Sequence, residues 1–281
     1  MLTGATIPRG RLRRQPASSS GGGMIGILDS GVGGLGLVRA LAAGLPGVPL
    51  LFWGDTARSP YGDKSPETVG RFAGEGLHYL LDQGARVIVI ASSTIASCLP
   101  GEVRERTPVP VWDPLEPAAR RALACSRRGA IGVVASPATV ATGSYPARLK
   151  ARSAGIRVHV RACPLLTSLI CAGWLKKPET LRIAKKCLHP LKVRQVDTLI
   201  LGSAFLPLLQ PVIGRKLGRS VVLLDAAAIL AETVVEAFKS EVVAGAAAVL
   251  PRLMVTDHNP QAVNTARLLL RGEPRLQPLP R

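Results

Sequence analysis

The sequence predicts an α/β fold with two similar doubly wound, mainly parallel-sheet domains and an active-site cleft between them. Short apolar runs alternate with segments of helical period from residue 24 onward, which is typical of parallel sheets with right-handed crossovers. Two of these runs, 87–91 and 198–202, end alike, in a serine followed by an expected helix. Ser92 and Ser203 are 111 residues apart (203 minus 92), about the length of one domain. Strand ends of this kind place ligand groups at a cleft.

The expected elements follow from the period of the apolar residues. Residues 71–81 have an apolar face of helical period that includes Phe72, Leu77 and Leu80. The apolar runs between such segments predict nine strands, at 24–28, 49–53, 86–91, 109–113, 130–134, 157–160, 196–201, 220–224 and 252–256.

The chain is strongly basic, with a formal net charge of +18 from 36 Lys and Arg against 18 Asp and Glu. The basic residues come mostly in ones and twos, such as Arg120-Arg121 and Lys185-Lys186. Aromatic residues make up 4% of the chain, and none is interleaved with the basic pairs as a base-stacking surface requires. We therefore interpret the charge as dispersed and predict no nucleic-acid partner.

Other features concern membrane, redox state and the amino terminus. No stretch reaches the roughly 18 apolar residues of a membrane span, so we expect no membrane partner; the run 242–250 is expected to be a buried helix. Five cysteines without a CxxC pair, and without a secretory signal, predict a reduced cytoplasmic protein rather than a disulfide scaffold. The acid-free, Arg-rich residues 1–23 are expected to be a disordered tail or a misassigned start before Met24, in preference to a transit peptide.

A glycine-rich loop follows the first expected strand. Gly31, Gly33 and Gly36 satisfy GxGxxG, and Asp55 ends the next strand, where a ribose-binding acid would lie in a dinucleotide site. A dinucleotide-binding protein is therefore one alternative. Asp29 argues against it, because a carboxylate at the start of this loop occupies the place of a pyrophosphate at the helix N-terminus.

Several motifs occur in an order that resembles the glutamate racemase family of aspartate/glutamate racemases, from Met24 to about Gly272. The motifs are Asp29-Ser30-Gly31, Gly54-Asp55-Thr56-Ala57-Arg58 with Pro60-Tyr61-Gly62, Ala91-Ser92-Ser93-Thr94, Ala162-Cys163-Pro164-Leu165, the segment 201–209 and Leu253-Met254-Val255-Thr256-Asp257. The resemblance implies interconversion of L- and D-glutamate without a cofactor or metal, to supply D-glutamate for peptidoglycan, by a homodimer. It also implies that 226–281 joins 24–117 in the first domain, leaving 118–225 as the second.

The resemblance also assigns the site residues. Ser92 and Ser203 stand where the family has its two catalytic cysteines, and Asp29 stands at the position of an assisting aspartate. The residues expected to bind the glutamate are Asp29, Ser30, Pro60, Tyr61, Gly62, Ser93, Thr94, Ala204 and Phe205.

The two serines put the family's chemistry in question. Racemisation without a cofactor needs a base on one face of the α-carbon and an acid on the other, and thiols with a pKa of about 8.5 suit both roles. A serine hydroxyl is far less acidic and needs a neighbouring base. Phe205 stands at the family's histidine position and moves no proton. A catalytically inactive amino-acid-binding or regulatory protein is therefore a second alternative, in which Ser30, Ser92 and Thr94 could simply cap helix N-termini.

Overall fold

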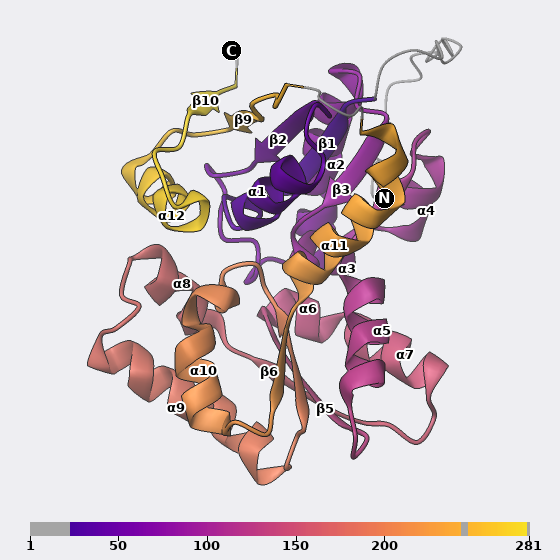
Figure 1. The fold of residues 1–281 in the computed structure, drawn as a ribbon. Helices are drawn as coiled ribbons and strands as arrows, with labels where there is room; N and C mark the ends of the chain where they lie inside the picture. Colours follow the sequence, from indigo (N-terminus) through magenta and orange to yellow (C-terminus); the bar gives the residue numbers. More distant parts are fainter. Residues whose placement is uncertain (1–22, 243–246, 280–281) are drawn as a thin grey trace, which may run out of the picture.

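The computed structural model describes residues 23–242 and 247–279, and in this part of the chain ten strands form two separate sheets (Figure 1). The first sheet has the order β10-β9-β2-β1-β3-β4, and the second has the order β6-β5-β7-β8. The strands of the first sheet are β1 (Ile25–Asp29), β2 (Leu50–Gly54), β3 (Val87–Ile90), β4 (Val111–Trp112), β9 (Arg252–Val255) and β10 (Leu276–Pro278). Those of the second are β5 (Ala130–Ala135), β6 (Arg157–Ala162), β7 (Thr198–Gly202) and β8 (Val222–Asp225).

Every strand pairing in both sheets is parallel, which confirms the predicted fold class. All nine expected strands are present, and β10 was not expected because three residues carry too little pattern. The central strands β1, β2, β3, β5 and β7 are buried along their whole length, as strands covered by helices on both faces should be.

Helices connect the strands and cover the sheets. In order they are α1 (Leu35–Gly44), α2 (Pro66–Asp82), α3 (Ser93–Cys98), α4 (Gly101–Arg106), α5 (Leu115–Cys125), α6 (Pro137–Ala141), α7 (Ser144–Arg152), α8 (Pro164–Cys171), α9 (Pro178–Val193), α10 (Gln210–Leu217), α11 (Ala226–Phe238) and α12 (Pro260–Leu270), with short 3-10 turns at Leu206–Leu209 and Lys239–Glu241. α11 leads the chain back from the second sheet to the first and packs against α1 and α5 (Figure 1).

The helix expected over 71–81 lies inside α2, which begins five residues earlier. Ser65 caps it, because its hydroxyl accepts a hydrogen bond from the N–H of Thr68 at 3.3 Å. Pro66 follows at the first helical position, where a missing N–H costs nothing. The cap and the proline, rather than the apolar period, set this boundary.

Two expectations are wrong. The described part of the run 242–250 is not helical, and residues 247–250 are exposed, while residues 243–246 lie outside the described residues. The cysteines are not all reduced, since Cys163 and Cys187 are paired as a disulfide with their Cα atoms 6.1 Å apart. The fold joins them by placing α9 beside the end of β6.

No helix in the described part of the chain has both the length and the apolar character to cross a bilayer. Residues 1–22 of the expected tail lie outside the described residues.

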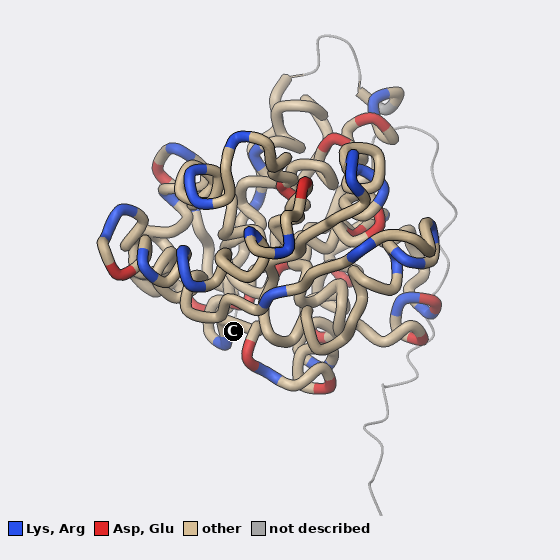
Figure 2. Tube along the Cα trace, turned by 90° about the horizontal axis from the view of Figure 1, so that it is seen from below, with Lys and Arg blue, Asp and Glu red and all other residues tan. Residues whose placement is uncertain are grey.

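The basic residues are not dispersed as the sequence suggested. Residues 118–225, which include all of the second sheet, carry 19 Lys and Arg against three acidic residues. Residues 24–117 and 226–281 together carry 13 basic and 15 acidic residues, and residues 1–23 carry four arginines. In the view from the side of the second sheet, Lys and Arg recur along the outer segments (Figure 2). The excess of positive charge therefore lies in the half of the molecule that contains the second sheet.

Candidate active site

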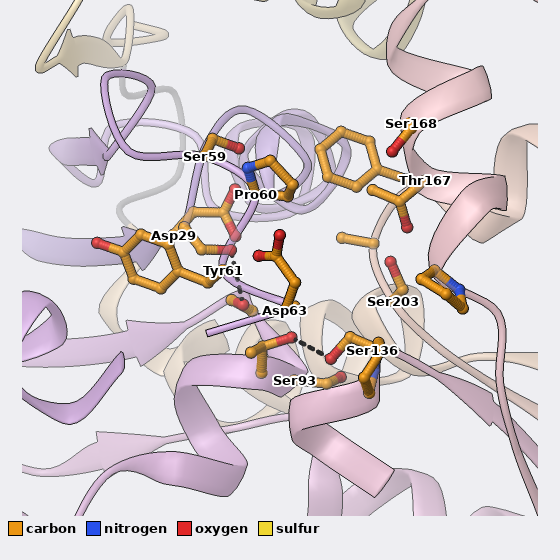
Figure 3. A pocket seen from close by; sticks show the side chains of 18 of the residues that line it. Asp29, Ser59, Pro60, Tyr61, Asp63, Ser93, Ser136, Thr167, Ser168 and Ser203 are labelled. Carbon is orange, nitrogen blue, oxygen red and sulfur yellow. Dashed lines mark hydrogen bonds between the residues drawn. The ribbon is translucent and has the colours of Figure 1, made fainter. Parts of the chain in front are cut away.

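A cavity of about 260 Å³ lies where the carboxyl ends of the two sheets face each other. Its walls come from the segments after β1, β3, β5, β6 and β7, as expected for ligand sites in parallel α/β folds. Asp29 and Ser59 lie on one side of it and Ser168 and Ser203 on the other (Figure 3). Nine of the lining residues are serine or threonine: Ser30, Ser59, Ser92, Ser93, Thr94, Ser136, Thr167, Ser168 and Ser203.

Asp29 ends β1 and is 2% exposed. Burial raises the pKa of its carboxyl from 3.8 to about 6, although hydrogen bonds from the backbone of Gly34, Ser30, Gly33 and Gly31 oppose the shift. The N–H of Gly34 donates to Oδ2 of Asp29 at 3.0 Å. A carboxyl with a pKa near neutrality can take up or release a proton under ordinary conditions.

This geometry argues against a dinucleotide site. The N–H groups of the glycine loop turn toward Asp29, so they are already used where a pyrophosphate would need them. Asp55 is fully buried and accepts hydrogen bonds from Arg58, Tyr61 and Thr256, which leaves it unable to hold a ribose. Gly33 serves close packing instead, since a Cβ there would lie 3.1 Å from the ring of Phe205.

Ser92 lies 6% exposed at the end of β3 and is the N-cap residue of α3. Its hydroxyl is 3.0 Å from the hydroxyl of Ser30 and accepts a hydrogen bond from the N–H of Ile95 at 3.3 Å. The capping role expected as the structural alternative is therefore real, and it coexists with a position in the cavity wall. Neither partner is a base that would activate the hydroxyl.

Ser203 lies on the opposite wall, directly after β7. Within the described part of the chain no hydrogen bond involves the Ser203 side chain, so no neighbouring group is placed to take its proton. Figure 3 shows this side chain facing the cavity. Its neighbours Ala204 and Phe205 also line the cavity, and their side chains carry no polar atom. The helix expected after this serine begins at Leu206 as a 3-10 turn. The two serine turns thus face one cavity, but their surroundings differ.

Pro60, Tyr61 and Gly62 form a rim segment after a cis Ser59–Pro60 bond. The hydroxyl of Tyr61 does not reach into the cavity, because it donates to the buried carboxylate of Asp55. The carbonyl of Gly62 accepts a hydrogen bond from the N–H of Ala138 at 2.9 Å, which ties this rim to the segment after β5.

Ser93 and Thr94 bring in partners that sequence reasoning missed. The hydroxyl of Ser93 is 3.2 Å from that of Tyr145, and the hydroxyl of Thr94 is 2.8 Å from that of Ser136. Ser136 follows β5 and caps α6, so it is a third turn of the strand–serine–helix kind. That repeated pattern is the signal that would have identified it. Tyr145, by contrast, has no sequence signal of its own.

Nothing in the described part of the chain gathers three His, Cys, Asp or Glu side chains in the manner of a metal site. The cavity lining holds no Lys or Arg either. Any carboxylate bound there would be held by hydroxyl groups and backbone N–H groups.

Fold and site define a two-sheet α/β protein with a small, hydroxyl-rich cavity between paired strand ends. Residues 35–234 match the Asp/Glu/Hydantoin racemase family, and the chain belongs to this family. It is 38% identical over 212 residues to a glutamate racemase of Syntrophus aciditrophicus, covering 75% of this chain and 78% of that protein.

Solved structures agree with the sequence match. A glutamate racemase isoform from Bacillus anthracis superposes with a TM-score of 0.86 at 28% identity, covering 92% of this chain and 97% of that one. A glutamate racemase from Francisella tularensis in complex with D-glutamate gives a TM-score of 0.83 at 27% identity, with 91% and 97% covered. By sequence and structure the protein groups with the glutamate racemases.

Proposed function

We propose that the cleft binds glutamate and that the protein interconverts its enantiomers far more slowly than two thiols would allow. The observation that carries this proposal is the difference between the two walls. One wall keeps Asp29, Ser30 and Ser92 in a polar setting, whereas the other presents Ser203 beside Ala204 and Phe205. Such a site can bind an amino acid although it does not provide an acid–base group on each face of the α-carbon.

Binding is supported by the size and chemistry of the cavity. Its volume of about 260 Å³ lies just below the roughly 300–1000 Å³ usual for drug-sized ligands, as suits a small amino acid. The hydroxyls of Ser93, Thr94 and Ser136 can donate to a carboxylate. The similar protein from Francisella tularensis was solved with D-glutamate. In this proposal Pro60 and Gly62 contact the ligand from the rim, and Tyr61 contributes its ring rather than its hydroxyl.

Slow chemistry follows from the groups beside the serines. Ser92 is hydrogen-bonded to Ser30 and to a backbone N–H, and neither can remove its proton. Each positioned acid or base typically contributes about 10²–10⁴-fold, so two missing thiols cost on the order of 10⁴–10⁸. Asp29 is the lining group whose pKa of about 6 suits proton transfer. In this slow reaction Asp29 carries the proton on one face of the α-carbon.

The test follows the α-proton of glutamate. Wild type, the Ser92→Cys/Ser203→Cys/Phe205→His variant and a control with thiols outside the cavity, Ser153→Cys/Ser240→Cys, are incubated with L- or D-glutamate in D₂O. Deuterium incorporation is followed by NMR, and calorimetry measures binding of each enantiomer.

We expect both enantiomers to bind wild type, with exchange close to that of buffer, and the cavity variant alone to gain exchange and inversion. Absence of binding to either enantiomer would refute the glutamate site. Wild-type exchange as fast as that of the cavity variant would refute the slow chemistry.

The remaining parts of the proposal concern organisation. Residues 24–117 with 226–281 form the first domain and 118–225 the second. This division is supported by the sheets, because one contains β1–β4, β9 and β10 and the other contains β5–β8. The protein is a cytoplasmic homodimer, as its resemblance to the family implies. Light scattering of the purified protein measures its mass, and a monomer at micromolar concentration would contradict the dimer.

A further inference from the structure

The second half of the molecule carries almost all of the net charge, and α9 concentrates part of it on one face. Arg182, Lys185, Lys186 and Lys192 are exposed and spaced by three, one and six residues, which places them along one side of the helix. The opposite side, with Thr180, Ala184, Leu188 and Leu191, is buried. From Arg182 to Lys192 this row of cations is about 15 Å long.

The neighbouring strand extends the same surface. β6 is the outermost strand of its sheet, it packs beside α9, and Arg157 and Arg161 on it are exposed. His159 lies between them on the same face, and its pKa reflects the positive charge around it. Burial and then the positive charges of Arg194 and Arg157 lower the pKa of its imidazole. We call Arg157, Arg161, Arg182, Lys185, Lys186 and Lys192 the α9–β6 basic surface.

Acidic residues do not neutralise this surface. No ion pair within residues 23–242 and 247–279 includes any of its six cations. Of the three acids in 118–225, Asp197 is used by Ser126 and the backbone of Arg128, and Asp225 caps α11. Glu179 alone is exposed on the helix. A surface of unpaired like charges attracts partners of the opposite charge, so an anionic partner suits this one.

Two alternative roles for this surface fit the geometry less well. Attraction of glutamate to the cleft would place cations at its mouth, yet no residue of α9 or β6 lines the cavity. An amphipathic membrane helix needs a free apolar face, and that of α9 is packed on the sheet. The surface is polar, elongated and Arg- and Lys-rich, which suits the phosphate backbone of a nucleic acid.

We propose that the α9–β6 basic surface binds the phosphate backbone of double-stranded nucleic acid, independently of sequence. This reverses the expectation drawn from the chain alone, where the same residues looked dispersed. A duplex fits better than a single strand, because neither α9 nor β6 contains a Phe, Tyr or Trp on which unpaired bases would stack. The row of about 15 Å spans roughly four base pairs.

The test uses full-length protein and a fluorescently labelled 20-base-pair DNA duplex of arbitrary sequence, titrated by anisotropy between 50 and 200 mM NaCl. The first variant is Lys185→Glu/Lys186→Glu/Lys192→Glu. The matched control reverses three exposed cations outside the second sheet, Arg106→Glu/Lys239→Glu/Arg275→Glu. Both variants change the net charge equally and keep residues 1–23. Thermal unfolding shows that each is folded, and vesicles of phosphatidylserine replace DNA in a parallel titration.

With about five phosphates neutralised, wild-type affinity should fall about 500-fold over that salt range, a slope near −4.5 in log K against log salt. The α9 variant should bind at least about 100-fold more weakly at 50 mM NaCl, with a slope shallower by about 3, while the control changes less than about threefold. Equal losses in both variants would overturn the proposal, because net charge alone would then explain binding. Binding to vesicles but not to DNA would also overturn it.

Discussion

Replacing Asp29 by asparagine should stabilise the protein at neutral pH by removing a buried charge. The folded-state pKa of Asp29 is about 6 against an ordinary value of 3.8, so the folded chain binds this proton more tightly than the unfolded chain. The free energy of unfolding of wild type therefore falls as pH rises from about 4 to about 6, and the full penalty of about 3 kcal/mol is present above that range. The neutral amide of the variant carries no such penalty at any pH.

The assay is urea unfolding of wild type and Asp29→Asn at several pH values. Relative to its acid limit, the difference between their unfolding free energies should grow mainly between pH 4 and pH 6 and level off at about 3 kcal/mol above that range. Altered hydrogen bonding to Gly34 adds an offset that does not depend on pH. The control is Asp63→Asn, which removes a carboxylate at the cavity rim whose side chain is 69% exposed. A pH dependence for Asp29→Asn no larger than that of the control would refute the buried-charge reasoning.

Three further changes test other parts of the structure. Tyr61→Phe removes the hydroxyl that donates to buried Asp55 and should lower the free energy of unfolding by about 1.5–3 kcal/mol in urea titrations; a neutral result would exclude this hydrogen bond. Gly34→Ala places a Cβ 2.5 Å from that of Ala91 and should lower the free energy of unfolding by about 1–3 kcal/mol. The Cβ of Gly36→Ala meets nothing within 4 Å, so this variant should raise the free energy of unfolding by about 0.5 kcal/mol. Thermal unfolding compares the two variants directly. Raising NaCl from 20 to 200 mM should raise Tm by about 2–4 °C through screening of the basic half, and a steady fall of Tm would contradict that self-repulsion.

Much of the site was predictable because its residues stand where strands end. Asp29, Ser92 and Ser203 each follow a buried apolar run, and parallel strands place such residues at one edge of a sheet. The direction of each side chain was not predictable. Tyr61 belongs to a loop motif, yet its hydroxyl turns to Asp55, a choice set by a buried carboxylate that needs donors.

The partners of these residues required the folded chain. Tyr145 meets Ser93 across 52 positions of sequence, and Cys163 meets Cys187 across 24, without any local pattern that links them. Residues 247–250 were expected to be buried and are exposed, because the apolar character of a run does not by itself say whether another segment packs on it.

The sequence by itself determined the fold class, the family and the two serine turns, because strand period, strand-end residues and motif order are local properties of the chain. The tertiary structure decided how those turns differ. The hydroxyl of Ser92 is hydrogen-bonded to that of Ser30, whereas Ser203 lies beside the apolar side chains of Ala204 and Phe205. It also placed α9 beside β6, so that exposed cations of both elements lie on one surface. Burial, pKa and surface charge depend on which distant segments pack together, and that is a property of the folded chain alone.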